Sequence, residues 1–485
     1  MSGITCIRNA AWAVAWEGTT QRHVYLQGAD IAFDADGIRH VGNRFEGTDL
    51  REIDGSRLMV MPGLVNIHSH PSSEPLNKGL MDELGSRKLG MSGLYEFMPI
   101  FRGDHDSNRA AAEVALCELL MSGVTTLVDL SVAYPGWLDL LGQSGMRAVA
   151  APMFRSARWF TRDGHSVEYE WDEAAGERAM ADALSLADQA NGHNSGRLTA
   201  MVSPSQVDTC SPELLKSAHA QARARKMSFQ IHAAQAVVEF NEMTRRHGMT
   251  PIEWLNSLGV LGAQSIIGHA IFVDEHPWLK WPDERDLEIL ASTGTTVAHC
   301  PTVFSRRGIM LHDIGRYRRA GVNLGIGTDT FPHNMIEEMR TASIVAKLAA
   351  GDVGTISLEQ VFEMATVGGA KALGRDDIGR LAPGCKADLV LVDLDHWAMR
   401  PLRDPLKSLV FSAGERPIRD VFIDGQQVVT KGRVITLDHA DALDRLEAGQ
   451  RRAMARTPKV DWAERTVDQA SPLAFALKPA SDLPA

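Results

Sequence analysis

Through the middle of the chain, short runs of strand length alternate with longer segments whose apolar residues recur at helical spacing. The runs at 58–67, 227–231 and 265–268 are largely apolar and bounded by turn residues, which is typical of buried strands. The segment after Ser211 has a helical pattern, with Ser211 able to cap it and Pro212 in the first helical position. Strands that alternate with helices indicate a parallel sheet of the α/β class. Such units can close into a (β/α)8 TIM-type barrel.

The two ends of the chain have a different pattern. Short alternating strands with Gly and Asp turns occupy 1–60 and 374–440, on both sides of the expected barrel at 61–373. Residues 441–485 combine a charged helix pattern with a tail that contains Pro and Ala, and we expect a C-terminal extension for packing or subunit contact. A chain of 485 residues, 44% of them hydrophobic, is too long for one compact unit, so we expect two domains.

Five side chains suited to metal binding or catalysis stand at strand ends. His68 and His70 are two residues apart and therefore on one face of a strand, where they can hold one metal ion, although such a pair is more often a half-exposed polar face. His232, His269 and Asp329 each end an apolar run of their own. Because the carboxyl ends of barrel strands meet at one rim, we expect all five to surround one point.

These motifs carry a resemblance to a known family. The chain resembles the amidohydrolase superfamily, in the group with triazine hydrolases, cytosine and S-adenosylhomocysteine deaminases, and phenylurea or thiocarbamate hydrolases. The resemblance implies a barrel, with the segments 1–60 and 374–440 joined in one small β-sandwich. The matching stretches, in the family's order, are 62–70, 119–129, 232–235, 268–269, 299–301, 327–329, 379–390 and 421–429.

The resemblance implies a ligand set of His68, His70, His232 and Asp329 around one divalent metal ion. Such an ion keeps an open position for water and lowers the pKa of that water toward about 7. Asp329 would be the general base, and His269 would polarise the substrate or align the water. The run at 198–205 lacks the bridging lysine of binuclear relatives, so we expect one ion. Zinc is favoured, with iron, cobalt and manganese as alternatives.

One departure from the family pattern bears on the reaction. Deaminases of this group carry Glu three residues after the histidine at 232, and this chain has Gln235, which can bind a substrate but cannot transfer a proton. Glu239, one helical turn further, could substitute in part for the missing acid, but the favoured interpretation is a solvated helix charge. The first hypothesis is therefore hydrolysis of a C–N, or C–S, bond at a urea, carbamate or amide-like carbonyl. The alternatives are an aminohydrolase or chlorohydrolase of an N-heterocycle such as a triazine, purine or pterin, and a non-catalytic binding relative.

Residues near the expected rim are candidates for the substrate wall. His299 is expected to orient the site, whereas Phe304 and Met335 replace polar family positions and predict a more apolar pocket. Trp159 lies in an aromatic-rich loop after a strand, and Tyr95 follows the first strand. This loop can be read as a lid over a planar substrate or as ordinary loop packing, and the sequence favours neither.

The amino-acid composition restricts the classes of binding partner. The chain has 50 basic and 61 acidic residues, a net charge of −11 and no dense basic run, so nucleic acids and anionic membranes are not expected partners. We expect a small-molecule substrate, a cytoplasmic location because signal-peptide and transmembrane patterns are missing, and, as in relatives, a homo-oligomer. The five scattered cysteines argue against a disulfide framework.

Overall fold

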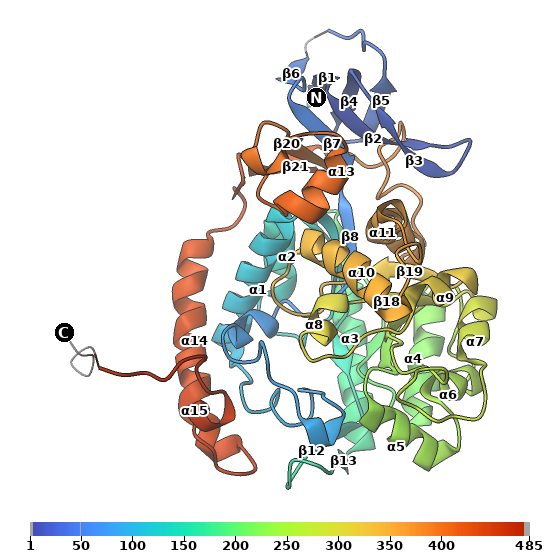
Figure 1. The fold of residues 1–485 in the computed structure, drawn as a ribbon, viewed down its shortest axis with the longest axis vertical. Helices are drawn as coiled ribbons and strands as arrows, with labels where there is room; N and C mark the ends of the chain where they lie inside the picture. The colour runs from blue at the N-terminus through green and yellow to red at the C-terminus, as the bar shows by residue number, and fades with distance from the viewer. Residues whose placement is uncertain (1–2, 49, 480–485) are drawn as a thin grey trace.

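Two four-stranded parallel sheets form the centre of the molecule (Figure 1). The computed structural model describes residues 3–48 and 50–479. In the first sheet the strand order is β14 (Leu198–Ala200), β10 (Arg147–Ala150), β9 (Val124–Asp129) and β8 (Leu64–Ser69). In the second it is β16 (Phe229–Ala233), β17 (Ser265–His269), β18 (Thr296–His299) and β19 (Asn323–Ile326). The predicted parallel α/β arrangement is confirmed for these strands.

Isolated parallel β-bridges join the two sheets at both of their edges. Ser69, at the end of β8, pairs with Asp329 beyond β19. At the other edge, Val202 pairs with Phe229 and Gln206 pairs with His232. The eight strands therefore follow one another in a continuous order, with their carboxyl ends on the same side.

Helices cover the outside of these sheets (Figure 1). As predicted, α4 begins at Pro212, and the Ser211 side chain accepts the N–H of Leu214 at 3.2 Å. The longer helices that follow or precede the central strands are α1 (His105–Met121), α2 (Trp137–Ser144), α3 (Glu173–Asn191), α4 (Pro212–Arg225), α5 (Val237–His247), α7 (Asp286–Thr293) and α10 (Met335–Ala350). Shorter helices are α6 (Pro251–Ser257), α8 (Pro301–Ser305), α9 (Ile314–Arg319), α11 (Leu358–Glu363), the π-helical turn η3 (Met364–Gly368), α12 (Gly369–Ala372) and α13 (Pro405–Ser408).

Strands from both ends of the chain share one sheet. Its order is β23 (Arg433–Val434), β22 (Gln426–Thr430), β21 (Ile418–Ile423), β20 (Leu389–Asp393), β7 (Leu58–Pro62), β2 (Trp12–Glu17) and β3 (Arg22–Leu26). An adjacent N-terminal sheet has the order β5 (Gly37–Gly42), β4 (Ala29–Asp34), β1 (Thr5–Ala10) and β6 (Arg51–Asp54). A core that includes Phe33 and Phe422, whose ring centroids are 5.2 Å apart, joins the two terminal segments.

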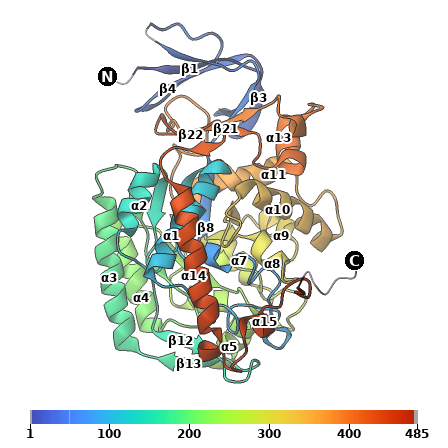
Figure 2. The same cartoon turned by 90° about the vertical axis from the view of Figure 1, so that its left-hand side faces the viewer.

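The C-terminal extension packs on its own chain. Figure 2 shows α14 (His439–Val460) lying along α1, and the Gln450 side chain donates to the backbone oxygens of Leu76 at 2.7 Å and Lys78 at 2.8 Å. Beyond α15 (Val467–Ala470), the hydroxyl of Ser471 donates to the oxygen of Leu80 at 2.7 Å. The extension therefore fixes the long loop between β8 and α1. Across residues 3–48 and 50–479 we find no helix with both the length and the apolar character needed to cross a bilayer.

Candidate metal centre

The structure brings the five predicted side chains together at the carboxyl ends of four strands. His68 lies in β8, and His70 follows that strand directly. His232 and His269 lie at the ends of β16 and β17, and Asp329 follows β19. All five side chains are buried or nearly so.

Four of these side chains direct ligand atoms at a common point. The Nε2 atoms of His70 and His232 are 3.2 Å apart. Oδ1 of Asp329 lies 3.5 Å from Nε2 of His68 and 3.3 Å from Nε2 of His70. Nε2 of His68 is buried and has no hydrogen-bond partner among the described residues. Three imidazoles and one carboxylate in this arrangement fit one divalent transition metal ion, for which they are the usual ligand types.

Acceptors behind the imidazoles fix which nitrogen faces the centre. Nδ1 of His70 lies 2.7 Å from the backbone oxygen of Leu130, and Nδ1 of His232 lies 2.6 Å from that of Ser205. Because a carbonyl oxygen can only accept, each Nδ1 carries the proton and each Nε2 presents a lone pair. Neutral imidazoles in this tautomer are ready to bind a cation.

Gln230 provides the acceptor behind His68, and it was not among the predicted site residues. Its Oε1 lies 2.6 Å from Nδ1 of His68, and its Nε2 donates to the backbone oxygen of Ile67 at 3.1 Å. The second bond fixes the amide so that oxygen faces the imidazole. A signal was present in the sequence, since Gln230 stands two residues before His232 and a strand places such residues on the same face.

The protonation states agree with this interpretation. Burial lowers the pKa of His232 well below its usual range and lowers that of His269 to about 3. Burial alone would raise the pKa of Asp329, but the neighbouring imidazoles of His68 and His70 hold it well below its usual range. The imidazoles of His232 and His269 are therefore neutral and the carboxylate of Asp329 is ionised, as a metal ion requires. Against the effect of burial, Asp329 raises the pKa of His70, whose proton a bound cation would displace.

The backbone at the centre is strained at several positions. Ala234, His269, Ala270 and Asp329 have φ values of 55°, 85°, 44° and 57°, in the left-handed region that non-glycine residues rarely adopt. A glycine is required beside them, because a Cβ on Gly268 would lie 2.8 Å from Cε1 of His68. Such strain is typical of functional sites, where surrounding contacts hold the chain in place.

His269 stands at the edge of the centre. Its Nδ1 is buried without a partner among the described residues, and its ring lies 4.7 Å from the ring of Phe304 in an edge-to-face arrangement. Ligand atoms of His68, His269 and Cys300 also lie within 4.8 Å of one another. Phe304 thus lies beside His269, and its place in a substrate wall stays a prediction. The proximity of Cys300 was not predicted.

The prediction that Glu239 is a solvated helix charge was wrong. This residue is fully buried rather than solvated, because the first turn of α5 packs beneath the loop after β16. Its carboxylate accepts the backbone N–H of Ala234 at 2.5 Å and that of Gln235 at 3.3 Å. Burial raises the pKa of Glu239 well above its usual range, and the charge of Asp208 raises it further. A carboxyl group that can hold a proton therefore lies directly behind Gln235.

A second buried carboxyl group near the centre was not predicted. Glu74 stands four residues after His70 and is 4% exposed, and its N–H donates to the backbone oxygen of His70 at 3.3 Å. Burial raises the pKa of Glu74 to about 7, against the opposing effects of His70 and Arg307. The sequence offered no signal for it, because an isolated glutamate in a loop is ordinarily a solvated charge.

The other candidates for the substrate wall differ in where they lie. Tyr95 and Trp159, the latter in the hairpin of β12 (Ala157–Phe160) and β13 (Glu168–Trp171), pack edge to face with ring centroids 5.6 Å apart. They share a buried cluster with Ala236, so both flank the loop of Gln235. His299 ends β18, and burial lowers its pKa to about 4. Met335, by contrast, is fully buried in the main core, and its N–H donates to the hydroxyl of Ser122 just before β9. Since Ser122 precedes the amino end of β9, we remove Met335 from the wall.

A family comparison agrees with this geometry. Residues 59–428 match the amidohydrolase family. The chain belongs to that family. The family resemblance that the sequence motifs suggested is therefore confirmed.

Several deaminases are similar to the chain over most of its length. A 5-methylthioadenosine/S-adenosylhomocysteine deaminase from Pelotomaculum thermopropionicum is 30% identical over 424 residues, which cover 86% of this chain and 91% of the relative. A 5'-deoxyadenosine deaminase from Methanothermobacter thermautotrophicus is 28% identical over 400 residues, or 82% of this chain and 88% of the relative. The chain is thus a member of a family whose named relatives include enzymes that act on C–N bonds.

Solved structures show the same fold. An adenosine deaminase from Xanthomonas campestris with bound zinc superposes with a TM-score of 0.79 at 24% identity, covering 93% of this chain and 98% of that one. Atrazine chlorohydrolase from Arthrobacter aurescens, complexed with zinc, gives a TM-score of 0.75 at 23% identity, covering 92% of this chain and all of that one. At these identities the likeness concerns the fold alone.

Proposed function

We propose that this protein is a metal-dependent aminohydrolase that removes an amino group from a small N-heterocycle. The observation that carries the proposal is the convergence of His68, His70, His232 and Asp329 on one point beside His269. The similarity to several named deaminases supports the heterocycle. This alternative is better supported than the urea or carbamate hydrolysis that Gln235 favoured, and we revise the order of the two hypotheses accordingly.

We further propose one divalent ion, with zinc favoured, held by His68, His70, His232 and Asp329. When bound, it would supply a Lewis acid that activates water at neutral pH. The acceptors at Nδ1 fix the tautomer in which the Nε2 atoms of His68, His70 and His232 face the ion. Asp329 is the general base, because its carboxylate stays ionised beside the centre and can accept a proton. His269, neutral and with a buried unpartnered nitrogen, orients the attacked carbon or the water.

Gln235 would hold the heterocycle rather than protonate it. Its carboxamide can donate to a ring nitrogen or accept from an amino group. Glu239 fixes the backbone of this residue, and burial raises the pKa of Glu239, which favours its protonated form. Phe304, Tyr95 and Trp159 would form the apolar wall against which a planar ring lies, and His299 would orient the site.

We also propose that the chain folds into a barrel and a composite sandwich. The continuous order of eight parallel strands and the bridges at both edges of the two sheets support a (β/α)8 barrel over 61–373. The sheet that joins both ends of the chain supports a composite β-sandwich of 1–60 and 374–440, followed by the extension at 441–485. In this arrangement the strand ends that carry the metal centre face away from the sandwich.

Hydrolysis of a urea or carbamate remains a second candidate, because Gln235 removes the acid that ring protonation uses. A release assay distinguishes the two. The purified protein, loaded with one zinc equivalent, would be incubated with panels of aminoheterocycles, phenylureas and thiocarbamates. Ammonia from a heterocycle supports the first candidate, and a larger amine or thiol from a urea or thiocarbamate supports the second.

Metal dependence is tested on the same preparation. Chelation should abolish turnover, and one equivalent of zinc, cobalt or manganese should restore it. His70→Ala should lower the metal content measured by plasma mass spectrometry. A chelated protein that keeps full activity would refute the metal-dependent mechanism.

A further inference from the structure

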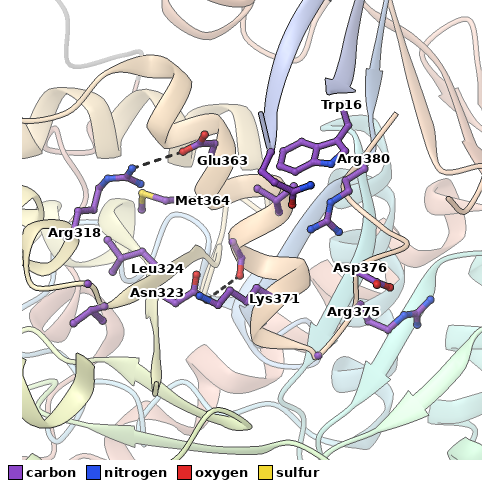
Figure 3. A pocket seen from close by; sticks show the side chains of 16 residues that line it. Trp16, Arg318, Asn323, Leu324, Glu363, Met364, Lys371, Arg375, Asp376 and Arg380 are labelled. Carbon is purple, nitrogen blue, oxygen red and sulfur yellow. Dashed lines mark hydrogen bonds and ion pairs between the residues drawn. The ribbon is translucent and has the colours of Figure 1, made fainter. Parts of the chain in front are cut away.

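A cavity of about 620 Å³ opens between the N-terminal strands and the amino end of β19 (Figure 3). Asn323, the first residue of β19, lines it, whereas Asp329 of the metal centre lies beyond the other end of that strand. None of the predicted metal ligands lines the cavity. Its contents would therefore be distinct from the substrate of the proposed reaction.

The walls of the cavity are held by close backbone contacts. They come from β2, from the helical run α11, η3 and α12, and from residues 374–380. A Cβ on Gly368 would lie 2.3 Å from the backbone oxygen of Leu324, and a Cβ on Gly379 would lie 2.8 Å from the carbonyl carbon of Thr366. The helical run is locally π-helical at η3, a distortion that is frequent at functional sites. Close backbone contacts therefore hold the walls of the cavity in place.

The lining is basic although the protein as a whole is acidic. It contains four basic side chains, of Arg318, Lys371, Arg375 and Arg380, and two carboxylates, of Glu363 and Asp376. When Asp377, which pairs with Arg375, is counted too, an excess of one positive charge remains in a chain whose net charge is −11. Such a local reversal of sign favours an anionic ligand.

Two of the basic groups are already paired. Arg318 lies 3.7 Å from Glu363, and the guanidinium of Arg375 donates twice to Asp377, at 2.6 and 2.7 Å. In Figure 3 no dashed line joins Lys371 or Arg380 to another lining side chain. These two cations are therefore the ones available to a ligand.

The contacts of Arg380 point more directly to a ligand than those of Lys371. Its guanidinium lies over the ring of Trp16, 4.9 Å from the centroid, which fixes its position (Figure 3). Its Nη1 is buried and, within the described part of the chain, has no hydrogen-bond partner. Because Nη1 is closed off from solvent, a ligand in the cavity would accept hydrogen bonds from the other guanidinium nitrogens of Arg380.

We propose that this cavity binds a small, multiply charged anion of the phosphate class, with Arg380 and Lys371 as its main contacts. A guanidinium donates to phosphate oxygens through its planar fork, and an ammonium adds a point charge. The volume is within the range of small-molecule sites, roughly 300–1,000 Å³, and exceeds what inorganic phosphate needs. A phosphate ester fits better than the free ion.

Isothermal titration calorimetry on the zinc-loaded full chain tests the proposal, with inorganic phosphate, pyrophosphate and a nucleoside monophosphate as probes. We expect saturable binding of at least one probe, weakened about ten-fold or more by the double substitution Arg380→Gln and Lys371→Gln. The matched control replaces two exposed cations elsewhere, Arg44→Gln and Lys216→Gln, and should leave the affinity unchanged. Tighter binding of the ester than of inorganic phosphate would identify an ester site, and equal binding would identify a site for the phosphate group alone.

Two results would overturn the proposal. One is the absence of saturable heat for all three probes at millimolar concentration. The other is binding that survives the double substitution but is lost in His70→Ala, which would assign the phosphate to the metal centre. Lys371→Gln alone serves if the double variant unfolds at a lower temperature, because Lys371 is exposed and its loss should not disturb the fold.

Discussion

The carboxylate of Glu239 accepts the backbone N–H of Gln235 at 3.3 Å, so the residue that we propose to contact the substrate is held by a buried acid. The same carboxylate accepts the N–H of Ala234, whose φ of 55° is unfavourable for alanine. Ala234 in turn accepts the N–H groups of Ile271 and Phe272, which follow His269. One buried side chain thus ties the ends of β16 and β17 together beside the metal centre.

We predict that Glu239→Ala lowers both stability and turnover. The substitution leaves two buried N–H groups without an acceptor, at about 1–3 kcal/mol each, and releases the loop of Gln235. The free energy of unfolding should fall by about 2 kcal/mol or more in urea titrations. The turnover number should fall about ten-fold or more, because the carboxamide of Gln235 is no longer positioned.

Glu242→Gln is the matched control for this prediction. Glu242 lies on the same helix but is only partly buried, and it pairs with Arg245 and Arg246 rather than with the loop. It should change turnover by less than about two-fold. Glu239→Gln keeps one acceptor and should lie between the two. Equal turnover in Glu239→Ala and the natural protein would show that the loop is positioned by other contacts.

A second prediction concerns Gln230. Gln230→Leu removes the acceptor that fixes His68 in its tautomer, so zinc affinity should fall about 10–100-fold in chelator competition. Gln230→Glu retains an oxygen at that position and should lose much less. If the leucine variant binds zinc as tightly as the natural protein, metal binding alone fixes the ring of His68.

The sequence was sufficient for the features that depend on spacing. His68 and His70 on one strand face, and His232, His269 and Asp329 at strand ends, could be brought together because parallel strands end on one side. The sequence was not sufficient where a contact between distant parts of the chain determines the position of a residue. Glu239 has the polarity of a surface residue and is buried only because α5 returns beneath its own loop. Met335 follows Asp329 closely in sequence, yet its helix begins beside Ser122.

Stability should depend on pH through Asp286, which lies away from the metal centre. Burial and the charge of Asp274 raise the pKa of Asp286 from 3.8 to about 7, although the Thr250 hydroxyl donates to it at 2.6 Å. Between these two values the folded state binds more protons than the unfolded state, so stability falls as the pH rises through this window. The loss is about 2–4 kcal/mol between pH 4 and 8.

Asp286→Asn isolates this effect. Urea unfolding of the metal-free protein at several pH values gives the difference between the natural protein and the variant, in which the other titrating groups cancel. The variant should lose less stability above pH 7 than the natural protein does. Parallel pH profiles of the two proteins would show that Asp286 stays ionised in the folded state.

The last prediction separates the two candidate reactions. Gln235→Glu places an acid where deaminases of the group carry one, held by the same backbone bond to Glu239. If the substrate is a heterocycle whose ring nitrogen must be protonated, general acid catalysis should raise kcat for ammonia release about ten-fold or more, with a new acidic limb in the pH profile. If the substrate is a urea or carbamate, no ring nitrogen needs a proton, so the added carboxyl group loses the carboxamide contact without a catalytic gain, and kcat/KM should fall. Gln235→Asn keeps the amide but shortens the side chain, and it should lower activity in both cases. An increase in kcat that occurs only in Gln235→Glu would therefore show that the gain comes from proton transfer.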